Sequence, residues 1–353
     1  VSIADVTTGD YFVTELDTER KLLDEIHKFT PSEIICNEAF YMTGMDFEDL
    51  KHRLNIAIYS LDSWYFSDET AKNTLLSHFK VADVQGLGLE DYGSGTVAAG
   101  ALLKYLYETQ KNSLGNMTSL QLYSTGKYMI IDSSTRRNLE LVETLREKNK
   151  TGSLLWVLDK TCTAMGARTL RSYVEQPLID ETLINERLDT VGALLDAPMI
   201  RDEIREYLNP IYDLERLISR ISYQSATPRD LIAFRTSLER IPPIRNLLEN
   251  FEQPVLKRIY GDMDGLEDLC DLVTRSILED PPLAVKEGGI IRDGYNEQVD
   301  QYRKSKSEGT KWLAQLEASE RERTGIRNLK IKYNRVFGYY LEVTNPFKDL
   351  VPE

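Results

Sequence analysis

A short stretch near the end of the chain concentrates positive charge. Residues 321–340 contain six Lys or Arg residues and one Glu, a net charge of +5. The whole chain of 353 residues carries −14, so everything outside this stretch carries −19. A compact basic segment on an acidic protein indicates contact with a polyanion at one place only. The alternative is that these charges form the solvated face of an ordinary two-stranded ribbon.

Two other patterns could support chemistry, and each has a plainer explanation. Asp5, Glu38 and Asp91 lie near expected strand ends, where gathered carboxylates can hold two Mg²⁺ ions about 4 Å apart. Nothing in the spacing brings these three together, which favours ordinary surface carboxylates. The glycines within 86–95 precede a helix and could cradle a phosphate. Their spacing is not GxGxxG and no Lys-Ser/Thr follows, which favours a tight turn and a helix start.

The sequence lacks the common catalytic motifs. It contains no GxxxxGK[ST], HExxH or GxSxG pattern, so the chain is predicted not to be an enzyme. The three histidines are isolated, and the three cysteines form no CxxC pair. Neither a zinc site nor a disulfide framework is therefore expected, and a reducing compartment is favoured. Cys270 lies on an apolar helical stripe and is expected to be a buried thiol.

A long helix is expected to position the basic segment. Apolar residues spaced in threes and fours mark one helical stripe: Val299, Tyr302, Trp312, Leu313 and Leu316. Gly325 follows a charged last turn, where helices tend to stop. The hydrophobic period then changes to two, which predicts strands over about 329–333 and 337–343. A turn near Asn334 and Arg335 would join them.

The first part of the chain has an α/β pattern. A hairpin is expected around Gly9, between apolar runs at 2–6 and 11–14. The run at 33–37 suits a covered strand, and Ser67 is expected to cap a helix. These features predict a small α/β domain over residues 1–113.

Two short strands are expected at 120–123 and 128–131, and helices dominate after Asp132. Predicted N-cap residues mark the starts of the helices: Asp132 or Ser133 for the first, then Asp180, Asp213 and Thr227. The first helix should include the apolar residues of 139–145, and Pro198 should end the second. Ile241, Pro242 and Pro243 should close the helix that Thr227 begins. Because each apolar stripe is single-faced, every helix is expected to bury it in a shared core.

Length and composition set the broad class. A chain of 353 residues allows two or three domains, and 41% hydrophobic with 28% charged residues is typical of a folded, soluble protein. No apolar run approaches the roughly 18 residues that span a membrane. The sequence opens with Val1 and shows no signal peptide. We therefore expect a fragment of a longer protein.

Three stretches resemble the MutS family of DNA mismatch repair proteins. They are Tyr128–Asp132 with Thr135–Leu141, then Ala226–Leu231, then Leu329–Thr344. The first two are similar to the opening and a second signature of the family's helical core, and the third to its clamp. The resemblance covers nearly the whole chain, and the three stretches in this order are highly specific.

The resemblance implies a multidomain fold of the α/β plus all-α class. Residues 1–113 would be a connector domain with a ribonuclease-H-like fold, and 114–317 a helical core with a long lever helix. Residues 318–353 would be the first part of a β-hairpin clamp. In the family a second lever helix returns after the clamp, the mismatch-reading domain comes first and the ATPase comes last. ATP and Mg²⁺ would then bind outside this chain, and no cofactor is expected within it.

The resemblance also implies a function in mismatch repair. The chain would link the ATPase to the mismatch-reading domain and contribute clamp contacts to the DNA backbone. Candidate backbone-binding residues are Arg327, Lys330, Lys332 and Arg335. Expected partners are duplex DNA, MutL through the connector, and a second subunit in the parent homodimer, all in a bacterial cytoplasm and away from membranes. One alternative is a docking module for MutL with negligible DNA binding, and another is a metal nuclease on the α/β domain.

Overall fold

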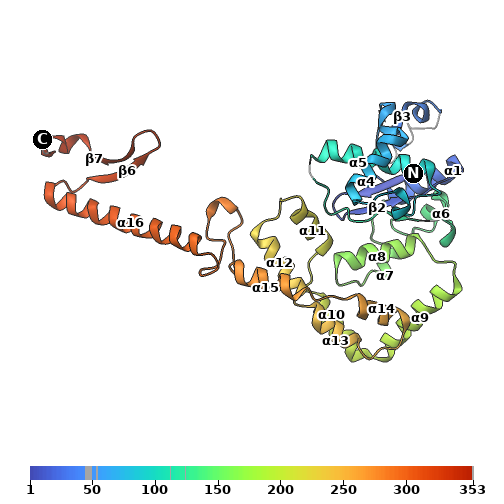
Figure 1. Ribbon diagram of the computed structural model, residues 1–353. Helices are drawn as coiled ribbons and strands as arrows, with labels where there is room; N and C mark the ends of the chain where they lie inside the picture. Colours follow the sequence, from blue (N-terminus) through green and yellow to red (C-terminus); the bar gives the residue numbers. More distant parts are fainter. Residues whose placement is uncertain (44–49, 53–54, 112, 124, 352–353) are drawn as a thin grey trace. The chain divides into compact units, whose positions relative to one another are not determined.

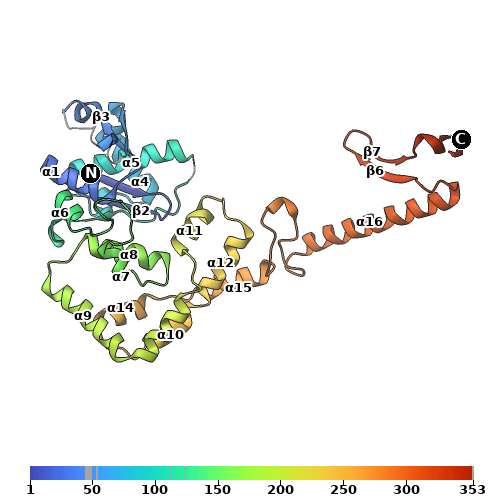
Figure 2. The same cartoon turned by 180° about the vertical axis from the view of Figure 1, so that it is seen from behind.

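The computed structural model describes residues 1–43, 50–52, 55–111, 113–123 and 125–351. The chain divides into two compact units, Val1–Val273 and Thr274–Glu353. Figure 1 and the reverse view in Figure 2 follow the chain through both units, from blue to red. Among the helices in the described ranges, none combines the length and apolar composition that crossing a membrane would require.

The first unit begins with strands that form two small sheets. β1 (Ser2–Asp5) and β2 (Asp10–Val13) make the expected antiparallel hairpin. β5 (Gln121–Leu122) runs parallel to β2 and completes a three-stranded sheet. β3 (Glu33–Asn37) and β4 (Ala57–Leu61) form a separate parallel pair. The expected strand at 33–37 is confirmed, whereas the ribonuclease-H-like arrangement stays a prediction.

Helices pack on these strands. α1 (Glu19–Phe29) places Ile26 in a cluster with Cys36 and Ile58 of the β3–β4 pair. α4 (Asp68–Phe79) and α5 (Gly93–Gln110) pack against each other, and α5 also contacts β1 and β2. Ser67 caps α4 as expected, because its side chain accepts a hydrogen bond from Thr70 N. A short α2 (Glu38–Tyr41) follows β3.

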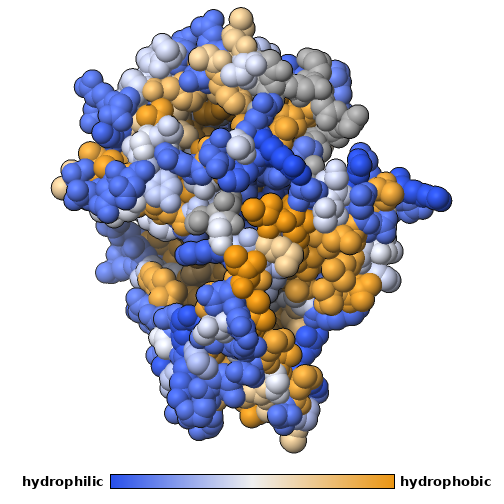
Figure 3. Space-filling model, turned by 90° about the vertical axis from the view of Figure 1, so that its right-hand side faces the viewer, coloured by the Kyte–Doolittle hydropathy of each residue, from blue (hydrophilic) through white to orange (hydrophobic). Residues whose placement is uncertain are grey.

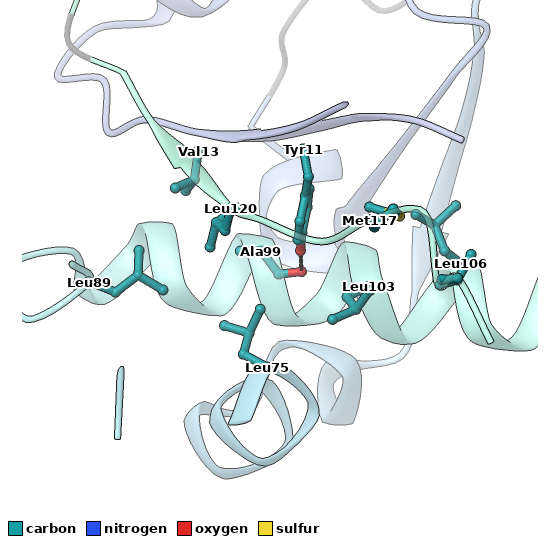
Figure 4. Packing of buried hydrophobic residues seen from close by; sticks show 10 residues of the cluster. Tyr11, Val13, Leu75, Leu89, Ala99, Leu103, Leu106, Met117 and Leu120 are labelled. Atoms are coloured by element: carbon teal, nitrogen blue, oxygen red, sulfur yellow. Dashed lines mark hydrogen bonds between the residues drawn. The ribbon is translucent and has the colours of Figure 1, made fainter. Parts of the chain in front are cut away.

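Together these strands and helices form an α/β layer. Its main core lies between β2 and α5 (Figure 4). Tyr11 is fully buried, and its hydroxyl donates a hydrogen bond to the carbonyl of Ala99. Leu114, Met117 and Leu120 pack into the same cluster from the segment that follows α5. The packed layer therefore continues past the predicted boundary at residue 113.

The rest of the first unit is helical. Its helices are α6 (Ser133–Asn138), α7 (Leu154–Leu158), α8 (Ala164–Glu175), α9 (Glu181–Asp196), α10 (Pro198–Leu208), α11 (Leu214–Ser222), α12 (Pro228–Leu238), α13 (Ile241–Leu248), α14 (Pro254–Asp262) and α15 (Glu267–Ser276). The predicted N-caps are confirmed by side-chain hydrogen bonds to the first-turn N–H groups: Asp132, Asp180, Asp213 and Thr227. Local capping chemistry was therefore a reliable guide to where these helices begin.

Two local predictions in this region are wrong. Residues 129–131 form no strand, and only Tyr128 makes an isolated bridge, to Leu178. The helix expected to include 139–145 stops at Asn138. Glu140 has a φ of 48°, in the left-handed region, which a continuing α-helix does not allow. Turns follow in place of the expected helix.

Two helices end before prolines, as the sequence predicted, and these prolines also begin the next helices. α9 ends at Asp196, and Pro198 occupies the first turn of α10. Pro242 and Pro243 likewise stand in the first turn of α13. Proline fits this position because the first-turn N–H groups have no partner within the helix.

The apolar stripe of α9 is exposed, so the expectation that every helix buries its stripe is wrong for this helix. Leu188 and Leu195 are each 60% exposed. α10 and α14 contact α9 through a different side, where Leu194 joins the cluster of Ile244, Leu248 and Leu256. Figure 3 views the molecule from the α9 side of Figure 1, and apolar residues form patches at this surface.

Cys270 is only partly buried, so the expectation of a buried thiol is wrong in degree.

The second unit is built on one long helix. After a short η4 turn (Val285–Glu287), α16 spans Glu297–Thr324 and is followed by β6 (Lys330–Asn334) and β7 (Gly338–Glu342). The η5 turn (Asn345–Leu350) ends the unit's regular structure in the described part of the chain. The predicted order of helix, strand and strand is confirmed.

Candidate nucleic-acid interface

The helix that carries the basic segment starts and stops at well-defined caps. Asn296 accepts a hydrogen bond from Val299 N at 3.1 Å, and Gly325 closes the other end with a φ of 71°. The Gly325 N–H donates to the carbonyl of Arg321 at 2.9 Å. A left-handed C-terminal cap favours glycine, as the sequence predicted. The 28 residues of α16 extend about 42 Å at 1.5 Å per residue.

The hairpin is tied to the last turns of α16. Ile326 and Leu329 are buried at the junction. Glu317 accepts a hydrogen bond from Ile331 N at 2.8 Å and pairs with Arg321 at 2.6 Å. Arg321 Nε in turn donates to the carbonyl of Leu329 at 2.7 Å. These contacts fix the hairpin alongside the end of the helix, as Figure 1 shows.

The hairpin register determines which side chains share a face. β6 and β7 are antiparallel, with Lys332 opposite Tyr340 and Tyr333 opposite Tyr339. The rings of Tyr333 and Tyr339 lie 5.1 Å apart between centroids. Because side chains alternate along a strand, Lys330 and Lys332 point to the face opposite this tyrosine pair. The two lysines therefore share one face of the hairpin.

Three cations of the basic segment have carboxylate partners close by. Arg321 pairs with Glu317, and Arg323 makes a two-pronged contact with Glu320, whose Oε2 lies 2.8 Å from Arg323 Nη2. This contact lowers the pKa of Glu320 and raises that of Arg323. Lys332 Nζ lies 2.6 Å from Glu342 Oε1 on the other strand. The hydrogen bond with Glu342 raises the pKa of Lys332.

The other three cations are exposed and have no carboxylate within ion-pair distance among the described residues: Arg327, Lys330 and Arg335. β6 advances about 13 Å from Lys330 to Asn334, beyond which the turn carries Arg335. One small anion cannot reach cations so far apart, whereas the repeated phosphates of a nucleic acid can. The arrangement therefore suits a polyanion.

The four predicted contact residues thus fall into two groups. Within the described ranges, Arg327, Lys330 and Arg335 are available to meet an anion, while Lys332 shares its charge with Glu342. The sequence reasoning missed the neutralising carboxylates. The i,i+4 and i,i+3 spacings of Glu317–Arg321 and Glu320–Arg323 are visible in the sequence and could have revealed two of them.

The other sequence patterns have structural explanations. Asp5 Oδ1 accepts hydrogen bonds from Thr7 N at 2.8 Å and Thr7 Oγ1 at 2.6 Å, so this carboxylate holds the β1–β2 turn. In the described parts of the chain, no three His, Cys, Asp or Glu residues are grouped as metal ligands would be. At the start of α5, Glu15 Oε1 accepts from Gly95 N at 2.7 Å. A side-chain carboxylate thus occupies the position that a phosphate would need.

The fold and site define a class: a multidomain α/β and α-helical protein with a basic β-hairpin at the end of a long helix. Sequence models of two family domains match this chain, MutS domain II over residues 1–118 and MutS domain III over residues 134–342. The chain therefore belongs to the MutS family.

Curated relatives agree with this assignment. The chain is 60% identical over 353 residues to a DNA mismatch repair protein MutS of Lachnoclostridium phytofermentans, which covers all of this chain and 38% of the relative. It is 47% identical over 352 residues to that of Ruminiclostridium cellulolyticum, covering 99% of this chain and 40% of the relative. It is 44% identical over 356 residues to the MutS protein of Acetivibrio thermocellus, and the match covers 100% of this chain and 41% of the relative. The chain spans about two-fifths of the length of these relatives.

Proposed function

We propose that this part of the MutS family chain grips duplex DNA through the phosphate backbone, using the hairpin as a clamp. Arg327, Lys330 and Arg335 make the phosphate contacts, and Lys332 contributes less because Glu342 already holds its ammonium group. Support comes from three exposed cations that lack a carboxylate partner in the described part of a chain with a net charge of −14. Phosphate contacts carry no sequence information, so the fragment binds without preference for a mismatch.

The long helix is proposed to act as a lever. Its 28 residues join the hairpin to the rest of the chain, and the Glu317–Arg321 contacts make the hairpin move with the helix end. A rigid helix of this kind can convert a change at one end into a displacement at the other. In the whole protein, ATP with Mg²⁺ and the mismatch would be bound by regions outside this chain, and two subunits would work together in the cytoplasm. The fragment alone is proposed to have no ATPase activity, which an ATP turnover assay on repurified protein checks.

Fluorescence anisotropy with labelled duplex DNA at a series of salt concentrations tests the clamp proposal. Each neutralised phosphate contributes about −0.9 to the slope of log K against log salt. The triple variant Arg327→Gln, Lys330→Gln, Arg335→Gln should therefore flatten the slope by about 2.7. Homoduplex and mismatched duplex should bind equally.

A charge-matched control separates the hairpin from bulk electrostatics. The triple variant Lys304→Gln, Lys306→Gln, Lys311→Gln removes three positive charges from α16, in the same unit. It should leave the slope close to that of the unaltered chain. Equal losses in the two variants would refute a specific role for the hairpin. A clear preference for mismatched DNA would refute the claim that the fragment does not discriminate.

A second candidate is a docking function for MutL on the α/β layer. A cluster of four aromatic side chains on that layer, two of which are exposed, is described below and favours a protein-binding role. If docking is the main role, capture of purified MutL should persist after removal of residues 318–353, while DNA binding is lost. Loss of MutL capture with the hairpin would contradict this candidate.

A further inference from the structure

Four aromatic side chains gather on one side of the α/β layer, and together they are called the aromatic surface here. Tyr59 belongs to β4, Trp64 and Tyr65 to the η1 turn (Ser63–Phe66), and Tyr105 to α5. Trp64 and Tyr65 stack with their ring centroids 3.9 Å apart. Tyr59 and Trp64 remain 49% and 44% exposed. Clustered exposed aromatics are unusual on a surface that nothing covers.

Acidic side chains hold this surface together. Tyr105 donates a hydrogen bond to Glu33 Oε2 at 3.1 Å, and Tyr65 donates one to Glu108 Oε2. The bond to Glu108 raises the pKa of Tyr65 to about 12. Asp62 is exposed immediately before the η1 turn. The rings and carboxylates are therefore fixed relative to one another before any partner arrives.

The β3–β4 register places Tyr59 in the same group. Glu33 lies opposite Ala57 and Ile35 opposite Tyr59 in this parallel pair. Paired residues share a face, and every second residue returns to it, so Tyr59 projects to the same face as Glu33. Because Glu33 accepts the hydrogen bond of Tyr105, the exposed ring of Tyr59 borders the same surface.

A cation of the chain already lies on this surface. Lys104 Nζ is 5.8 Å from the centroid of the Trp64 ring and 3.4 Å from Glu108 Oε1. The Lys104 ammonium group thus lies near an aromatic ring and a carboxylate at the same time, which is the arrangement that a cationic ligand would use. Glu33, Asp62 and Glu108 against Lys104 leave a net charge of −2.

We propose that the aromatic surface is a docking site for a protein segment rich in arginine or lysine, whose cationic side chains lie against Tyr59 and Trp64 and meet the surrounding carboxylates. Charge selects this class of partner. The acidic rim repels the phosphates of a nucleic acid, so the aromatic rings are not a base-stacking platform. The proposal goes beyond DNA contact and concerns the other unit of the chain, so its failure would leave the clamp proposal intact.

The test uses the full chain and a labelled short peptide of alternating arginine and alanine, with binding followed by anisotropy. A peptide with citrulline in place of arginine keeps the shape but removes the charge, and it should not bind. The double variant Tyr59→Ala, Trp64→Ala should weaken binding of the arginine peptide about tenfold, from the loss of two exposed cation–π contacts. Its net charge is unchanged, so general attraction to the acidic chain is preserved.

The double variant Tyr302→Ala, Trp312→Ala is the matched control, because it removes the same residue types from exposed positions of α16. It should bind the peptide as the unaltered chain does. Equal affinity in both double variants, or equal loss in both, overturns the proposal. Asp62→Asn provides a second check that leaves the rings in place: a loss of several-fold is expected, and no loss at all also overturns the proposal.

Discussion

Replacing Glu25 with glutamine should destabilise the α/β layer. The loss in stability should be larger than the loss from breaking an exposed ion pair on the same helix. Glu25 and Lys28 lie on α1 with side chains only 10% and 9% exposed, and Glu25 Oε2 is 2.9 Å from Lys28 Nζ. Tyr123 donates a hydrogen bond to the same oxygen at 2.8 Å. The ammonium group also lies 4.6 Å from the ring centroid of Phe29 and 4.8 Å from that of Tyr123. Glu25 is thus the centre of a buried polar cluster.

The size of the effect follows from taking away the carboxylate that pairs with a largely buried ammonium group. Burial lowers the pKa of Lys28, and Glu25 offsets part of that shift. Removing one member of a buried ion pair costs about 3–5 kcal/mol. The new amide oxygen would still accept from Tyr123, and the two rings would still face the ammonium group, so the lower end, about 3 kcal/mol, is expected.

Urea unfolding and amide hydrogen exchange of α1 measure this cost. Glu25→Gln should lower the urea midpoint and speed exchange in α1. The control is Asp17→Asn, which breaks the exposed contact with Lys21 and should change little. Adding Lys28→Met to Glu25→Gln should recover much of the loss, because no unpaired charge remains. Unchanged exchange in Glu25→Gln alone would refute the reasoning.

The remaining predictions concern packing, capping and pH. Gly100→Ala should destabilise α5 against α4 by about 1–3 kcal/mol, because the added Cβ would overlap the backbone of Ala71; a thermal melt checks this. Thr227→Ala should cost about 1 kcal/mol, because it removes the hydroxyl oxygen that accepts a hydrogen bond from Asp230 N at the start of α12; unfolding again measures this. Between the lowered pKa of Lys28 and 10.5, the unfolded chain binds more protons than the folded chain, so stability should rise with pH there. Lys28→Met should remove that increase in unfolding titrations, and an equal slope in the variant would contradict the assignment.

Local chemistry explains most of what could be read in advance. The caps at Asp180 and Thr227 and the stop at Gly325 depend on residues within one turn, so short spacings suffice to place them. The failure near Glu140 has the opposite cause. Its apolar neighbours fit a helical spacing, but the backbone enters the left-handed region there and the chain turns instead.

The candidate site was predictable in composition and less so in detail. The excess of positive charge in 321–340 and the alternation of the hairpin were both visible. Which lysine stays available was not, because Glu342 reaches Lys332 only when the strands pair in one register. The aromatic surface was missed entirely, since Tyr59 and Tyr105 lie far apart in the chain. Tyr105 is hydrogen-bonded to Glu33 of β3, and the pairing of β3 with β4 places Tyr59 on the same face as Glu33.

The sequence by itself determined where most helices begin, the hairpin, the uneven charge and the resemblance to a repair family, because each depends on neighbouring residues or on their order. Tertiary structure alone decided which charges are buried or neutralised and which apolar faces are covered. The apolar spacing of α9 is like that of helices whose stripe is buried, yet its stripe is exposed. The i,i+3 spacing of Glu25 and Lys28 is like that of exposed ion pairs, yet this pair is buried. Desolvation and pairing depend on what packs from distant parts of the chain, and one-dimensional spacing does not contain that information.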